Sequence, residues 1–105
     1  MNRLENKVAL VTGGSLGIGK SACFYLAKEG AKVAVTDILD IEGRGLAYEI
    51  NAMGYDAEYW HLDITDEENV KDVFEQVYKK FGKIDILINN AGVNGVNKYT
   101  HEITV

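Results

Sequence analysis

Four short runs of apolar residues divide the chain, and each has the length of a β-strand rather than of a helix. The runs ending at Thr12 and Thr36 are almost wholly apolar, which is typical of strands buried on both faces of a parallel sheet. The third run is rich in aromatic residues and alternates loosely. We therefore expect strands over residues 7–12, 32–36, 56–62 and 84–88.

Between these runs, apolar positions recur every three or four residues, which is the period of an amphipathic helix. The first helix follows a glycine-rich turn and is expected to stop at Gly30. The second is expected over residues 40–53, with Gly54 just beyond it. The third follows a capping-box pattern of Thr65 and Glu68. Its apolar face is expected to carry Val70, Val73, Phe74, Val77, Tyr78 and Phe81.

The resulting order is β-α-β-α-β-α-β. Strands that alternate with helices indicate a parallel sheet with right-handed crossovers, so the predicted fold class is a doubly wound α/β domain. A length of 105 residues suffices for one domain. The segment over residues 93–105 has no clear period, and we expect Glu102–Val105 to lead into a further helix.

Composition narrows the possible partners. The net charge of −5 argues against a surface for nucleic acid or anionic membranes, which would require a basic patch. No apolar run approaches the length of a membrane span, and residues 1–7 are polar, unlike a signal peptide. Cys23 is the only cysteine, so no internal disulfide forms. These features predict a cytoplasmic protein.

The glycine-rich turn Thr12-Gly-Gly-Ser-Leu-Gly-Ile-Gly19 joins the first strand to the first helix. Backbone N–H groups at a helix start have no partner within the helix, and a pyrophosphate can bind them where no side chain blocks its approach. Gly13 would allow the sharp turn, Gly17 the close approach of phosphate, and Gly19 the close packing of helix on strand. This pattern predicts a dinucleotide site.

The same stretch also satisfies a different pattern. Residues Gly14–Ser21 match the P-loop, in which Lys20 would reach phosphates and Ser21 would bind magnesium. A P-loop enzyme also needs an acidic magnesium partner at a strand end, and both Asp37 and Asp63 follow strands. The P-loop hypothesis and a glycine turn without any ligand therefore stay open.

Asp37 closes the second strand, 18 residues after Gly19. An acidic residue at about this distance accepts hydrogen bonds from the hydroxyls of the adenosine ribose, and it repels the 2′-phosphate of NADP. Ser15 and Ile38 are uncharged, so they would not neutralise that phosphate. The sequence thus favours NAD, while a turn or capping aspartate is the alternative for Asp37.

Taken together, these motifs resemble the first half of the short-chain dehydrogenase/reductase family. The resemblance rests on the loop Thr12–Gly19, on Asp37, on Leu62–Asp66 and on Asn89-Asn90-Ala91-Gly92, in this order. It implies a Rossmann-like sheet with strand order 3-2-1-4 and an oxidoreductase that uses NAD on an alcohol or ketone.

The resemblance also implies a role for each matching position. Asp63 would accept a hydrogen bond from the adenine amino group beside the Ile64 backbone, although it could instead simply precede the cap at Thr65. The segment from Asn90 would lie beneath the cofactor, although it could also be an ordinary turn. The implied cofactor-binding residues are Gly13, Ser15, Leu16, Gly17, Ile18, Gly19, Asp37, Ile38, Asp63, Ile64, Asn90, Ala91 and Gly92.

The family's catalytic Tyr-x-x-x-Lys pair is not found here. The chain has six tyrosines, and none is followed four residues later by lysine. We therefore assign no catalytic residue and no metal ligand, expect the chain to be the N-terminal part of a longer enzyme, and expect it to be inactive alone. The alternative is a module that binds NAD or another adenine nucleotide without turnover. The fourth strand would be an apolar edge, so we also expect a homo-oligomer.

Overall fold

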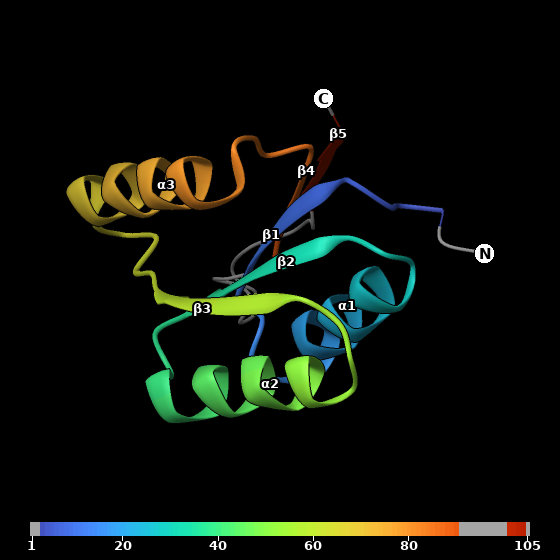
Figure 1. Cartoon of the computed structure of the whole chain (residues 1–105). Helices are drawn as coiled ribbons and strands as arrows, with labels where there is room; N and C mark the ends of the chain where they lie inside the picture. The colour runs from blue at the N-terminus through green and yellow to red at the C-terminus, as the bar shows by residue number, and fades with distance from the viewer. Residues whose placement is uncertain (1–2, 91–100, 105) are drawn as a thin grey trace.

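A five-stranded sheet with helices on both faces forms the structure (Figure 1). The computed structural model describes residues 3–90, together with the backbone of residues 101–104. All four predicted strands and all three predicted helices are present, with ends within a few residues of those expected. In chain order the elements are β1 (Val8–Thr12), α1 (Gly17–Lys28), β2 (Lys32–Asp37), α2 (Asp40–Ala52), β3 (Ala57–His61), α3 (Glu67–Phe81), β4 (Ile86–Asn89) and β5 (His101–Thr104).

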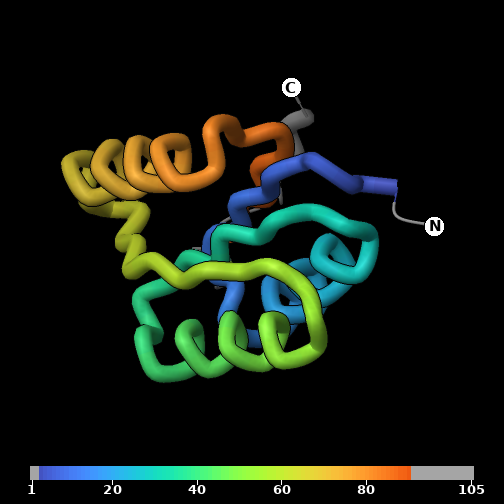
Figure 2. The backbone as a smooth tube through the Cα atoms, viewed as in Figure 1, coloured from blue at the N-terminus to red at the C-terminus, as the bar shows by residue number. Residues whose placement is uncertain are grey.

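The strand order is β3-β2-β1-β4-β5. The first four strands are parallel, so the predicted Rossmann-like arrangement is confirmed. Thr12 pairs with Thr36 on one side and with Asn89 on the other, and Asp37 pairs with His61. The carboxyl ends of β1, β2, β3 and β4 therefore lie along one edge of the sheet, as can be followed along the backbone in Figure 2.

The structure of the C-terminal segment differs from two expectations. Residues 101–104 form a strand rather than the approach to a helix, and this strand pairs antiparallel with β4. Leu87 pairs with Ile103, so the backbone of β4 has a neighbour on both sides and is not an exposed edge. A tail without helical period can still complete a sheet, because pairing draws on backbone N–H and C=O groups that every residue except proline carries.

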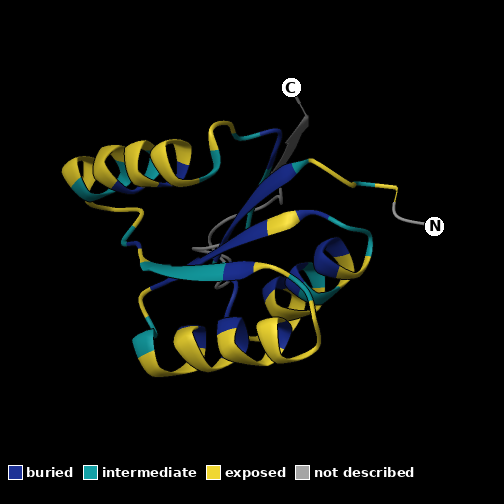
Figure 3. Ribbon diagram, viewed as in Figure 1, coloured by how far each residue is buried: buried dark blue, intermediate teal, exposed yellow. Residues whose placement is uncertain are grey.

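The two faces of the sheet bury different residues, because successive side chains on a strand point to opposite faces. Helices α1 and α2 cover one face and α3 covers the other, with their exposed residues turned outward (Figures 1 and 3). The core under α1 and α2 contains Ala9, Val11, Val33, Val35, Cys23, Leu26, Leu46 and Ile50, and the core under α3 contains Val8, Leu10, Ala34, Leu62, Val73 and Val77.

Helix α3 begins differently from the expected capping box. Its N-cap is Asp66, whose carboxylate accepts a hydrogen bond from the N–H of Asn69, whereas the Thr65 hydroxyl donates to Asp63. An aspartate cap at the next position gives an equivalent bond and adds a negative charge at the helix start. Tyr78, expected on the buried face, is 59% exposed.

No helix within the described part of the chain is long and apolar enough to cross a membrane.

Candidate functional site

The carboxyl edge of the sheet brings together the loops that follow β1, β2, β3 and β4. The predicted site residues that the structure describes lie in these loops, at the end of β2 or in the first turn of α1. Ala91 and Gly92 lie outside the described residues. In doubly wound sheets, ligands bind in the crevice at this edge, where the strand order reverses. Here the order reverses at β1, from which β2 and β4 extend in opposite directions.

The glycine loop has the backbone that its sequence predicts. Gly13 and Gly17 have φ angles of 62° and 57°, values that residues with side chains rarely adopt. A methyl group added at Gly17 would meet no atom within 4 Å, so the approach to the loop is open there. A methyl group at Gly19 would lie 2.0 Å from the Gly13 carbonyl oxygen, so the start of α1 and the loop touch backbone to backbone.

The start of α1 is uncapped. Its N-cap residue, Leu16, makes no side-chain cap hydrogen bond, and no acidic residue stands in the first turn. The helix start therefore presents backbone N–H groups and the positive end of its dipole at the sheet edge, as an anion site requires. Leu16 and Ile18 at this helix start are 53% and 72% exposed, and Ile38 after β2 is 58% exposed.

Asp37 lies at this edge, and hydrogen-bond donors of the protein itself are bound to its carboxylate. Oδ2 accepts hydrogen bonds from the Ser15 N–H at 3.1 Å and from the Ser15 hydroxyl at 2.5 Å. Oδ1 accepts from the N–H groups of Ile38 at 2.7 Å and Leu39 at 3.2 Å. A carboxylate has about four acceptor positions, so these four donors fill it.

The turn role considered for Asp37 therefore has structural support, and the ribose role stays a prediction. The carboxylate holds the β2–α2 turn, as the turn alternative predicted, and it also reaches the glycine loop through Ser15. A ribose hydroxyl would have to take the place of a present donor. The Ser15 hydroxyl is the one able to yield, because its proton can rotate about the C–O bond whereas backbone N–H groups are fixed.

Asn89 at the end of β4 and Asn90 after it hydrogen-bond to the start of the glycine loop. The Thr12 hydroxyl donates to the Asn89 side-chain oxygen at 2.9 Å and accepts from the Asn90 N–H at 2.9 Å. The Asn90 side-chain amide donates to the Gly13 carbonyl at 3.1 Å. Asn90 therefore supports the same peptide group against which Gly19 packs.

After β3, Asp63 is also engaged. Its Oδ1 accepts from the hydroxyl and the N–H of Thr65 at 2.6 and 2.9 Å, and these bonds hold the pKa of Asp63 below its usual value. The carboxylate therefore stays ionised and able to accept a further hydrogen bond. Beside it is a pocket of about 280 Å³ between the sheet and α3, lined by Thr12, Leu62, Ile64, Val70, Phe74, Leu87 and Asn89.

The P-loop hypothesis gains no support from this arrangement. Lys20 is exposed on the first turn of α1. Asp37 and Asp63, the two candidate magnesium partners, are held by neighbouring donors. Among the residues that the structure describes, no group of three or more His, Cys, Asp or Glu side chains could hold a metal ion.

Cys23 lies directly beneath the loop. Its sulfur is 3.8 Å from the Gly14 carbonyl oxygen and the residue is fully buried. Burial, reinforced by the negative charge of Asp37, raises the pKa of the Cys23 thiol to about 12. The thiol is therefore protonated at neutral pH and unsuited to act as a nucleophile.

Sequence reasoning missed a group of side chains next to Asp37. The Tyr59 hydroxyl lies 2.7 Å from the Asp37 carbonyl oxygen and 2.6 Å from Asp40 Oδ1, and His61 Nδ1 lies 2.7 Å from the same Asp40 oxygen. The alternation of β3 places Tyr59 and His61 on one face, which is the only sequence signal that could have linked them.

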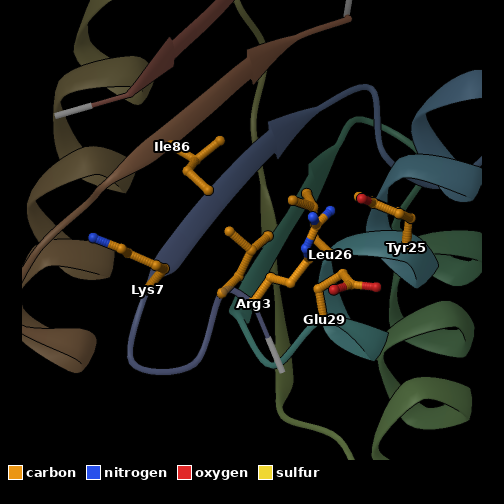
Figure 4. Close-up of a pocket in the computed structure, with 7 residues that line it drawn as sticks. Arg3, Lys7, Tyr25, Leu26, Glu29 and Ile86 are labelled. Carbon is orange, nitrogen blue, oxygen red and sulfur yellow. The ribbon is translucent and has the colours of Figure 1, made fainter. Parts of the chain in front are cut away.

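A second pocket lies away from this edge. It has a volume of about 400 Å³, and Figure 4 shows the side chains around it, which come from α1, the start of β4 and the residues before β1. Because Lys7 and Ile86 stand at the amino ends of β1 and β4, this pocket lies at the opposite edge of the sheet.

Comparison with known proteins agrees with this geometry. A family model described as short chain dehydrogenase matches residues 7–105. The chain is 42% identical over 105 residues to the uncharacterized oxidoreductase YxbG of Bacillus subtilis, covering all of this chain and 38% of that protein. It is 44% identical over 93 residues to (+)-borneol dehydrogenase 2 of Salvia officinalis, covering 89% of this chain and 32% of that protein.

A solved structure of a hydroxysteroid dehydrogenase from Escherichia coli superimposes with a TM-score of 0.83 at 39% identity, covering 86% of this chain and 38% of that one. The chain thus spans about a third of the length of the curated relatives described here. Because the family model covers nearly the whole chain, and the loop, the acidic residue and the asparagine turn follow in the expected order, the chain belongs to the short-chain dehydrogenase/reductase family.

Proposed function

We propose that this chain is the cofactor-binding part of an NAD-dependent oxidoreductase that interconverts an alcohol and a ketone. The observation that carries the proposal is the meeting of an open, uncapped glycine loop with Asp37 at the carboxyl edge of the sheet. When bound, the nicotinamide would accept or donate a hydride, and the residues described here would bind and orient the dinucleotide.

The residues present fit such a cofactor. The diphosphate would lie on the backbone N–H groups at the start of α1, where Gly17 leaves open space. The adenosine ribose would lie beside Asp37 and displace the Ser15 hydroxyl, with Ile18 and Ile38 providing apolar contact. The adenine would lie near Asp63 and Ile64, and Asn90 would lie beneath the nicotinamide side.

Charge favours NAD over NADP in this arrangement. The Asp37 carboxylate would repel a 2′-phosphate on the ribose. Arg44, a candidate to neutralise that phosphate, lies over the Tyr59 ring with its guanidinium carbon 5.7 Å from the ring centroid. Holding the phosphate would require Arg44 to give up this contact, which contributes about 0.5–1 kcal/mol at an exposed site.

Calorimetric titration of the complete gene product with NADH and NADPH tests the proposal. We expect NADH to bind at least about tenfold more tightly, a difference of about 1.4 kcal/mol. Asp37→Ala should remove most of this preference. Asp56→Ala removes an exposed carboxylate next to the amino end of β3 and serves as the matched control. Equal affinities for both dinucleotides, or an unchanged preference in Asp37→Ala, would contradict the assignment.

The remaining parts of the proposal concern the whole protein. We propose a small-molecule alcohol or ketone substrate, a cytoplasmic location and a homo-oligomer, and no partnership with nucleic acid or membranes. The catalytic tyrosine and lysine would come from sequence beyond Val105, so the 105-residue chain alone should not turn over any alcohol. Turnover by this chain would contradict that view, whereas NAD binding by a complete gene product without such a pair would favour the binding-module alternative.

A further inference from the structure

Tyr59 belongs to β3, and its side chain packs against α2, which runs along this strand (Figure 1). A methyl group added at Gly43 of α2 would lie 2.1 Å from Cε1 of the Tyr59 ring, so the ring rests directly on the helix backbone. Arg44 covers the ring with its guanidinium group. Because the ring is fixed between these neighbours, its hydroxyl is directed to one place.

The Tyr59 hydroxyl is directed to the turn that contains Asp37. The hydroxyl oxygen is 2.7 Å from the Asp37 carbonyl oxygen and 2.6 Å from Asp40 Oδ1. Both neighbours can only accept, and a tyrosine hydroxyl has one proton, so the two acceptors compete for this single proton. Burial and the hydrogen bond to Asp40 raise the pKa of Tyr59 well above its usual value, so the hydroxyl keeps its proton.

The Asp37 carbonyl belongs to the peptide group that joins Asp37 to Ile38. On its oxygen side this group accepts from Tyr59 and from the Leu62 N–H at 2.8 Å. On its nitrogen side the Ile38 N–H donates to the Asp37 carboxylate. The orientation of this peptide plane therefore contributes to where the carboxylate points, together with the donors from Ser15 and Leu39. Among the described residues, the side chain that hydrogen-bonds to this carbonyl is Tyr59.

We propose that Tyr59 is a positioning residue for cofactor selection, whose hydroxyl fixes the Asp37 peptide group so that the Asp37 carboxylate faces the adenosine ribose. This inference rests on the proposed function. A fixed carboxylate attracts the ribose hydroxyls of NADH and repels the extra phosphate of NADPH. A carboxylate whose turn is held less firmly does both less well, so loss of the hydroxyl changes the two affinities in opposite directions.

The test is Tyr59→Phe in the complete gene product, with dissociation constants for NADH and NADPH measured by calorimetry. Phenylalanine keeps the ring against Gly43 and removes only the hydroxyl. One lost hydrogen bond should reduce the ratio of the NADPH to the NADH dissociation constant about threefold to tenfold. Tyr48→Phe is the matched control, because Tyr48 is 76% exposed on α2 and should leave the ratio unchanged.

A second variant separates the carbonyl bond from the charge of Asp40. Asp40→Ala leaves the Tyr59 proton wholly to the Asp37 carbonyl, so the ratio should be retained. A ratio reduced as far as in Tyr59→Phe would instead assign selection to the Asp40 charge and overturn the inference.

The remaining outcomes are also decisive. Equal weakening of NADH and NADPH by Tyr59→Phe would indicate a merely structural role and overturn the inference. A wild-type protein that prefers NADH, combined with an unchanged ratio in Tyr59→Phe, would overturn the inference and leave the proposed function standing. A wild-type protein that binds neither dinucleotide would overturn both.

Discussion

Gly19→Ala tests whether the start of α1 and the glycine loop require backbone contact. The added methyl group would lie 2.0 Å from the Gly13 carbonyl oxygen, where ordinary van der Waals contact begins at 3.4 Å. The obstacle is backbone, so it cannot rotate away as a side chain would. The loop must move, and the Asn90 amide, which bonds to the same carbonyl, must move with it.

The magnitude follows from these contacts. Forcing a methyl group into a packed site costs about 1–3 kcal/mol, and the lost Asn90 bond costs about 0.5–1.5 kcal/mol. The better helix propensity of alanine offsets up to about 1 kcal/mol of this destabilisation. We therefore expect a net loss of about 1–3 kcal/mol in the free energy of unfolding, together with weaker NADH binding because the loop is displaced.

Gly45→Ala is the matched control. Gly45 also lies in a helix, α2, but a methyl group there would meet nothing within 4 Å. The same substitution should stabilise the protein by about 0.5–1 kcal/mol and leave NADH binding unchanged. Urea unfolding of the three proteins measures the free energies, and calorimetry measures binding. If the two variants had equal stability, or if Gly19→Ala bound NADH normally, the close contact would not be required.

Three further predictions concern buried groups. The Cys23 thiol, with its pKa raised to about 12, should resist alkylation by iodoacetamide at pH 8 in the folded protein and react once urea unfolds it; rapid reaction before unfolding would contradict its burial. Asp85→Ala should cost about 1–3 kcal/mol in urea unfolding, because it leaves the buried N–H of Val8 without its acceptor; an unchanged stability would refute this. Desolvation raises the pKa of Asp85, but the Val8 N–H and Lys83 outweigh it and hold the pKa below 3.8. The stabilisation from Asp85 should therefore be complete above pH 3.8 and be lost as the pH falls further, and thermal melts between pH 5 and pH 2 should show a smaller acid dependence in Asp85→Ala than in the wild type.

The sequence predicted the parallel core of the sheet well, because parallel strands are buried on both faces and leave apolar runs that stand out. It also brought the described candidate residues to one edge of the sheet, since they stand at or after the carboxyl ends of strands and parallel strands place these ends together. Their cofactor-binding roles stay predictions. The glycine loop could be interpreted position by position because its backbone angles and close contacts restrict the residue type.

Contacts between distant residues could not be predicted in the same way. Strand β5 has no apolar period that would predict it, and its backbone pairs with β4, more than ten residues earlier in the chain. The N-cap of α3 is one residue later than the sequence predicted. Thr65 and Asp66 can both cap a helix, and only the fold decides which does so. The bond from Tyr59 to Asp37 joins residues 22 positions apart, and no local pattern reports it.

The four donors held by Asp37 also bear on how cofactor preference can evolve or be engineered. Replacing this aspartate by arginine is the simplest way to bind a 2′-phosphate. The replacement would remove the acceptor of the N–H groups of Ser15, Ile38 and Leu39 at once. Ser15 is buried, so its N–H group left unsatisfied costs about 1–3 kcal/mol, whereas the N–H groups of Ile38 and Leu39 are only part-buried and cost less. This loss is a sizeable share of the about 5–15 kcal/mol that stabilises a whole domain, so a switch of cofactor at this position requires companion substitutions that rebuild the turn.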